Sequence, residues 1–261
     1  MNIKQKYLSG DDISFMVTPR LNAASRMDDP MRAFELLATL DEVEGGMLAD
    51  HLSKINDERK NIVKGIMREV NKKLEQSETH KAREVMVIGN PEWRIGILGL
   101  VAGKISDEYK KPVFVWGKDE NDCIKGSCRS DGSVSVVELM TVTRESFIDF
   151  GGHELAGGFT VHTDKIHFLE EALSLNFKKI TTLQDTPSAS STSPYIGGGQ
   201  VGVNFDVKLS LSDINLENWR EIEKLEPFGF GNPKPVFLFE GVKIEKIKRF
   251  GKNGSKIARH F

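Results

Sequence analysis

Residues 85–116 decide the fold, and they read VMVIGNPEWRIGILGLVAGKISDEYKKPVFVW. The first four residues form an uninterrupted apolar run, which indicates a buried strand. Residues 95–109 carry apolar and small side chains at helical spacing, and residues 112–116 form a second short apolar run. A strand, a helix and a second strand in this order are typical of an α/β domain.

The same alternation continues downstream of this unit. We expect the end of a strand at residues 124–127, a helix over 135–147, a strand over 159–161 and a helix over 165–179. Together with residues 85–116, these elements predict an α/β domain over residues 81–180.

Residues 41–76 predict one long amphipathic helix upstream of that domain. Apolar residues recur at spacings of three, four or seven, with charged residues between them: Leu48, Leu52, Ile55, Ile62, Ile66, Val70 and Leu74. A short helix over 31–40 is expected before it, so residues 31–80 form a pair of connecting helices. A coiled-coil or core helix is the alternative for the longer one. Residues 1–30 contain Pro19 and Pro30 and predict a short, partly irregular entry segment.

The chain changes character after the α/β domain. Residues 181–202 are rich in Ser, Thr, Pro and Gly, which predicts a flexible linker. Residues 203–261 predict a small β-rich module, with alternating polarity up to residue 209, a helix over 216–225 and strands near 236–238 and 242–247.

Composition excludes several classes of protein. The chain has 261 residues, and 36 basic against 38 acidic side chains give a net charge of −2, which excludes a globally basic binder. Two cysteines exclude a disulfide framework and a four-cysteine zinc site, so we expect a reducing, cytoplasmic location. The best apolar run, residues 95–102, is about one-third of what a bilayer requires, and the N-terminus has no signal-peptide pattern.

The first polar cluster is residues 18–26, TPRLNAASR. Arg20 and Arg26 carry planar guanidinium groups that suit phosphate or carboxylate, and Asn22 lies between them. A structural salt-bridge corner is the alternative interpretation of this cluster.

The second cluster is residues 125–130, KGSCRS. The end of an expected strand is followed by two hydroxyls and a guanidinium, which could form a phosphate cradle. These groups belong to Ser127, Ser130 and Arg129. A polar β-turn is the alternative.

The third cluster is residues 150–158, FGGHELAGG. Glycines on both sides of His153, among them Gly151 and Gly152, would let backbone approach a ligand closely. A structural histidine is the alternative.

Basic residues also gather near the C-terminus. Lys243, Lys246, Lys248 and Arg249 precede Phe250, and cations interleaved with aromatics are typical of single-strand binding surfaces. A solvated face over core phenylalanines is the alternative. No His, Cys or carboxylate cluster has metal-ligand spacing, so no metal site is expected in these residues.

Four motifs, in order, resemble those of RecJ-type single-stranded-DNA-specific exonucleases of the DHH phosphoesterase superfamily. They are residues 15–27, 93–102, 126–130 and 150–153, and residues 225–237 are similar to the entry into that family's OB fold. The resemblance implies that residues 1–30 end a DHH catalytic domain, 81–180 form a DHHA1 domain and 203–261 form part of an OB-fold domain. Ser25 and Cys128 stand where the family usually has glycine, and Arg94 where it commonly has histidine.

The resemblance also implies a function, a 5′→3′ single-stranded-DNA exonuclease of DNA repair and recombination. In such enzymes Mn²⁺ or Mg²⁺ in the DHH domain activates the attacking water. Arg20, Asn22 and Arg26 would line the cleft between domains, and His153 would position substrate or stabilise charge without binding metal. The phosphate near the 5′ end would be bound by Ser127, Arg129 and Ser130, with Gly151 and Gly152 close to the reacting nucleotide.

No DHH motif precedes residue 15, so we expect a fragment that lacks the metal domain, binds no cofactor itself and is inactive alone. The expected partners are single-stranded DNA and, beside it, a single-strand-binding protein, with no membrane and with a monomeric chain. Two alternatives stay open: a non-catalytic nucleic-acid-binding module, and a DHH-type small-oligonucleotide phosphodiesterase.

Overall fold

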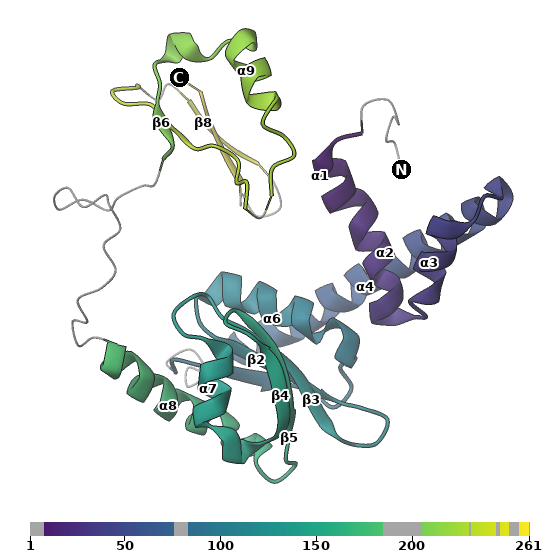
Figure 1. Cartoon of the computed structure of the whole chain (residues 1–261). Coiled ribbons are helices and arrows are strands. Elements are labelled where there is room, and N and C mark those ends of the chain that lie inside the picture. The colour runs from purple at the N-terminus through teal and green to yellow at the C-terminus, as the bar shows by residue number, and fades with distance from the viewer. Residues whose placement is uncertain are drawn as a thin grey trace. The chain divides into compact units, whose positions relative to one another are not determined.

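The computed structural model describes residues 8–75, 83–184, 205–229, 231–243, 246–250 and 256–260, the last two ranges as backbone only. The chain divides into two units, Met1–Ser190 and Ser191–Phe261 (Figure 1), and each is described by itself.

A five-stranded mixed sheet forms the centre of the first unit, with the strand order β1-β2-β3-β5-β4. The helix α6 (Ile95–Tyr109) connects β1 to β2, and these two strands are parallel, as a crossover connection requires. The remaining pairs are antiparallel. The strand bounds are β1 Met86–Gly89, β2 Val113–Lys118, β3 Ile124–Arg129, β4 Phe147–His153 and β5 Ala156–Val161. The structure therefore confirms the predicted α/β domain and the long helix before it.

Each face of this sheet carries its own hydrophobic core. One core joins the sheet to α7 (Val136–Val142) and α8 (Leu169–Gln184), with Phe114 and Phe159 at its centre. The other joins the sheet to α6 and to the C-terminal half of α4 (Glu42–Glu75), with Ile97 and Leu98 fully buried. Successive side chains of a strand point to opposite faces, so β1 and the first half of β2, which have a core on each side, are buried continuously, whereas buried positions alternate along β3.

The helix α4 has 34 residues, so it is about 51 Å long. Its buried side chains follow the predicted stripe, except that Val63 is buried where Ile62 is only partly covered. Glu69 fixes α4 to the start of α6 because its carboxylate accepts hydrogen bonds from the Trp93 indole at 3.0 Å and the Asn90 amide at 2.8 Å.

The entry segment is helical, which corrects the prediction of a partly irregular stretch. A short α1 (Gly10–Asp12), a π-helical stretch η2 (Ile13–Val17) and α2 (Thr18–Met27) follow one another. Pro19 lies at the start of α2, directly after the π-helical stretch, and the helical backbone continues through it.

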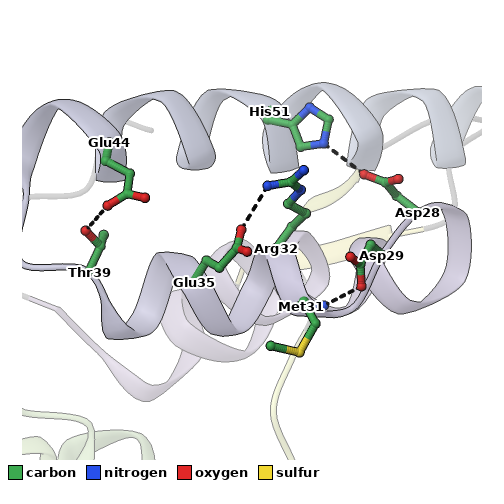
Figure 2. Close-up of polar contacts among 8 residues, drawn as sticks. All are labelled: Asp28, Asp29, Met31, Arg32, Glu35, Thr39, Glu44 and His51. Atoms are coloured by element: carbon green, nitrogen blue, oxygen red, sulfur yellow. Dashed lines mark hydrogen bonds and ion pairs between the residues drawn. The ribbon is translucent and has the colours of Figure 1, made fainter.

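The corner between α2 and α3 (Met31–Ala38) is fixed by short-range polar contacts (Figure 2). The Asp29 carboxylate accepts from the Met31 amide at 2.9 Å, and the Asp28 carboxylate pairs with His51 of α4 at 2.9 Å. The Arg32–Glu35 pair at 3.0 Å lies along α3 beside them.

Other elements also differ from the sequence prediction, and β5, for example, begins at Ala156 and not at residue 159. The strand β4 was not expected, and the helix expected over residues 135–147 ends at Val142, with a 3-10 turn over Arg144–Ser146. The helix α8 continues to Gln184, so residues 181–184 are helix and not linker. The rest of the predicted linker, residues 185–202, lies outside the described residues.

The second unit has little regular structure in its described part. Strand β6 (Val207–Lys208) pairs in parallel with β7 (Phe237–Leu238), and α9 (Leu216–Glu223) lies between them in sequence. Strand β8 (Lys246–Phe250) pairs antiparallel with β9 (Lys256–His260). The sequence predicted a strand near 242–247, but residues 242 and 243 lie before β8 begins. A search of the described residues finds no helix long and apolar enough to cross a membrane.

Two glycines of α6 predict opposite stability changes. An ideal Cβ on Gly96 would lie 2.3 Å from the Arg26 carbonyl oxygen of α2, whereas one on Gly103 meets nothing within 4 Å. We expect Gly96→Ala to lower the free energy of unfolding by about 1–3 kcal/mol through overpacking. Gly103→Ala should raise it by about 0.5–1 kcal/mol. Urea denaturation of both variants checks this, and equal effects would contradict the described contact.

The Asp28–His51 contact predicts a change in titration. The hydrogen bond from His51 is the main cause that lowers the pKa of Asp28. Because the folded-state pKa is lowered, this contact stabilises the fold above the ordinary carboxyl pKa and is lost as the pH falls through the lowered value. His51→Ala should therefore raise the Asp28 pKa toward 3.8 in a carboxyl NMR titration. Asp57, whose pKa is lowered mainly by its hydrogen bond from Lys60, should not move and is the internal control.

Candidate functional site

Two rows of residues cross the face of the sheet on which α6 lies. Directly opposed residues of antiparallel strands point to the same face, so the register defines each row. The first row runs across β3, β5 and β4 through Ser127, Gly158 and Gly151, and the second through Arg129, Ala156 and His153.

The helix α6 lies against the β3 end of both rows. An ideal Cβ on Gly99 would lie 2.9 Å from the Arg129 guanidinium and 3.6 Å from the Ser127 hydroxyl oxygen. The rows therefore begin with a cation and a hydroxyl under α6 and continue over glycine and alanine backbone. They end on β4, an edge strand, at the exposed imidazole of His153.

Four glycines of the β4–β5 hairpin fall into two classes. A Cβ on Gly152 would lie 2.3 Å from the Ala156 carbonyl oxygen, and the φ angle of Gly152 is +147°. A Cβ on Gly157 would lie 2.9 Å from the Gly151 carbonyl oxygen. Internal packing requires these two glycines. A Cβ on Gly151 meets nothing within 4 Å, and one on Gly158 meets an atom only at 3.7 Å. Packing does not explain these two, and they leave bare backbone on the open face.

Cys128 lies between Ser127 and Arg129 but points to the opposite face. Its side chain is buried, and burial raises the pKa of the thiol to about 12. A neutral, buried thiol is inert, so Cys128 is not a nucleophile. Arg129 points to the face on which α6 lies and donates to the Cys128 carbonyl oxygen at 2.7 Å.

Ser130 holds the loop that follows β3. Its hydroxyl donates to the Val134 carbonyl oxygen at 2.6 Å and accepts from the Gly132 amide at 3.0 Å. Because its one hydrogen is already used within the loop, Ser130 is a poorer phosphate donor than Ser127.

Residues 18–26 do not act as one group. Arg20 donates to the Ser53 hydroxyl of α4 at 3.3 Å and to the Met16 carbonyl oxygen. Both acceptors are neutral, so these contacts are not the salt bridge of the alternative interpretation. Asn22 is exposed on α2. Arg26 donates to the Gly96 carbonyl oxygen at 3.2 Å, which places its guanidinium at the start of α6.

Arg26 and Arg94 line the same hollow of about 420 Å³ beside the first turn of α6. Arg94 is the N-cap residue of that helix, and Lys118 at the end of β2 lies on the same hollow, which also contains Asp119 and Glu120. The sequence singled out Arg94 only as a departure from a motif. Its place beside Arg26 depends on the crossing of α2 over α6, which has no local sequence signal.

Of the predicted C-terminal basic residues, Lys243 is exposed. Lys246, Lys248, Arg249 and Phe250 belong to β8, but their side chains lie outside what the structure describes. Among the described residues, no group of three or more His, Cys, Asp or Glu side chains gathers where it could hold a metal ion. These residues therefore do not fit the Mn²⁺ or Mg²⁺ that the resemblance implies, and we assign no step to a metal here.

Comparison with known proteins identifies both units. Residues 82–179 match the family model of the DHHA1 domain, and residues 205–259 match that of the RecJ OB domain. The single-stranded-DNA-specific exonuclease RecJ of Bacillus subtilis is 30% identical over 259 residues, 96% of this chain and 31% of its own length. That of Thermus thermophilus is 29% identical over 92% of this chain and 32% of its own length.

The crystal structure of Thermus thermophilus RecJ in complex with Mn²⁺ superimposes with a TM-score of 0.75 at 26% identity. It covers 97% of this chain and 35% of the Thermus chain. The chain thus spans about a third of the length of these relatives.

The two classes of glycine predict different outcomes for alanine variants. Gly157→Ala should destabilise the fold by about 1–3 kcal/mol because its Cβ would contact the neighbouring strand and the core. Gly151→Ala should leave stability nearly unchanged. Thermal unfolding followed by circular dichroism compares them, and a large loss for Gly151→Ala would show that packing requires this glycine as well.

Proposed function

Because the chain belongs to the RecJ family through its DHHA1 and OB domains, we propose that it supplies the strand-binding parts of a 5′→3′ single-stranded-DNA exonuclease of DNA repair and recombination. The observation that carries this proposal is the pair of rows across β3, β5 and β4, in which a cation and a hydroxyl lead onto bare backbone.

The β3 end of the rows has the chemistry of a phosphate site. Arg129 offers guanidinium N–H groups beyond the one that contacts Cys128, and the Ser127 hydroxyl lies on the same face. Hydrogen bonds from a charged donor to phosphate are among the stronger ones in proteins. We assign the terminal 5′ phosphate to these two residues.

The bare backbone at Gly151 and Gly158 provides room for the sugar and base of the first nucleotide. A side chain there would hold the strand away from the sheet, although packing inside the protein would tolerate it. His153 at the far end of the second row is exposed. We propose that it positions the substrate or stabilises charge there. Ser130 and Gly152 support this surface from the loop and the hairpin.

Hydrolysis would depend on Mn²⁺ or Mg²⁺ held by residues outside the described ones. The Thermus relative, whose structure contains Mn²⁺, is about three times as long as the matched region, which is consistent with a metal-binding domain elsewhere in such proteins. We therefore propose that this chain alone binds strands as a monomer without degrading them. The OB domain, with its C-terminal basic residues, would guide the strand. A single-strand-binding protein is a further proposed partner, and the proposed location is the cytoplasm.

Removal of the Arg129 guanidinium tests the phosphate assignment. Arg129→Ala should weaken binding of a 5′-phosphorylated oligothymidylate by roughly 10–100-fold, since a hydrogen bond to a charged group contributes about 1.5–3 kcal/mol. The same substitution should weaken binding of the oligonucleotide with a 5′ hydroxyl much less. Fluorescence anisotropy without divalent metal measures both.

Arg144→Ala is the matched control, because it removes one arginine from the opposite face, where the guanidinium lies 5.1 Å from the Phe150 ring centroid. Equal losses in both variants would contradict a local phosphate site. Release of mononucleotides by the chain with Mn²⁺ would contradict the proposed absence of turnover, and tighter binding of dinucleotides than of long strands would favour a small-oligonucleotide phosphodiesterase.

A further inference from the structure

A groove of about 480 Å³ lies between α4 and α6, away from the two rows on the sheet. Its apolar lining comes from both helices: Val63 and Met67 of α4 and Leu100 of α6. Val63 is buried, and the other two are partly buried against the core beneath them. Apolar side chains thus form the base of a concave surface that the described residues leave open.

The remaining lining residues of this groove are all basic: Arg59, Lys60 and Lys64 of α4 and Lys104 of α6. Within the described part of the chain, no carboxylate lines it. Lys60 is paired with Asp57 at 3.0 Å, and the nearest acidic residues along α6, Asp107 and Glu108, begin almost one turn beyond Lys104. The groove therefore carries a local positive charge in a chain whose net charge is −2.

Arg59 carries hydrogen-bond donors that the protein does not satisfy. One terminal nitrogen donates to the Asn56 side-chain oxygen at 2.9 Å, but the buried Nε of Arg59 and the buried amide nitrogen of Asn56 have no partner. Burial and the nearby Arg26 cation both lower the pKa of Arg59. Because both nitrogens are buried, neither is open to a ligand in the groove, and Arg59 contributes to the groove as a cation at its lining.

We propose that this groove is a docking site for an acidic peptide segment of a partner protein, with apolar side chains on Val63, Met67 and Leu100 and carboxylates on the basic rim. The argument is charge complementarity joined to an apolar base, the combination used when an amphipathic segment lies in a groove. It does not depend on the proposed strand-binding function, since none of the groove residues lies on the two rows of the sheet.

Two features favour a peptide over a nucleic-acid strand. Single-strand binding surfaces stack bases on aromatic side chains, and this groove has none among its lining residues. Its base instead includes Met67, and the flexible thioether of methionine adapts to the apolar side chains of peptide ligands.

The test uses a fluorescein-labelled synthetic peptide that alternates aspartate with leucine and phenylalanine, and anisotropy as the readout. Lys64→Glu combined with Lys104→Glu should weaken peptide binding by at least roughly tenfold, and Met67→Ser should weaken it several-fold. The control is Lys165→Glu combined with Lys179→Glu, which makes the same charge change at exposed lysines beside the opposite face of the sheet. This control should bind the peptide like the unaltered chain.

Two further measurements make each outcome decisive. A peptide with serine in place of leucine and phenylalanine should bind much more weakly, and equal binding would reduce the groove to a general anion surface and overturn the proposal. Binding of 5′-phosphorylated oligothymidylate is measured in the same variants. If Lys64→Glu with Lys104→Glu weakens oligonucleotide binding and leaves peptide binding unchanged, the groove holds a nucleic-acid strand and the proposal fails.

Discussion

The close contact of the α6 backbone with its neighbours is the constraint on which the rest of the first unit depends. At Gly96 the helix meets the carbonyl of Arg26, and at Gly99 it meets the guanidinium of Arg129. A side chain at Gly96 would hold α6 away from the α2 backbone, whereas one at Gly99 would displace the Arg129 guanidinium. Since α6 also covers the core shared by the sheet and α4, the contact at Gly96 sets the spacing between these helices.

Glycine also recurs on the open part of that face, where packing does not require it. Gly151 and Gly158 have room for a side chain and lack one. The cation and hydroxyl beside them lie on β3, a central strand held on both sides by antiparallel pairing. A site built on paired strands holds its donors in fixed positions, which lowers the ordering cost of binding.

The sequence predicts the central elements well because their signals are local. The apolar and small residues over 95–109 predict α6 at its observed bounds, and the stripe over residues 41–76 predicts α4 within one residue at each end. The strand β4 was missed because Gly151 and Gly152 lower its strand propensity, and its pairing with β5 depends on the hairpin. Pro19 suggested irregular structure in a segment that is helical, and the helical backbone continues through it.

The candidate site was predictable in its residue types but not in its arrangement. Ser127, Arg129 and His153 were identified from short sequence clusters, yet only the strand register shows that they share one face. The hydrogen bond of the Ser130 hydroxyl within its own loop was also not predictable. The sequence also cannot separate the two classes of glycine, because each adjacent pair, Gly151–Gly152 and Gly157–Gly158, contains one member of each class. Whether a glycine is needed for packing depends on atoms that come from a neighbouring strand.

We propose that a DNA strand lies on the bare backbone between Arg129 and His153. NMR of the isotopically labelled chain, titrated with a 5′-phosphorylated oligothymidylate in the absence of divalent metal, tests this placement. We expect the backbone amide signals of Gly151 and Gly158 and the side-chain signal of Arg129 to shift together, with one binding isotherm. Shifts that are confined to other residues, with these three unchanged at saturation, would contradict it.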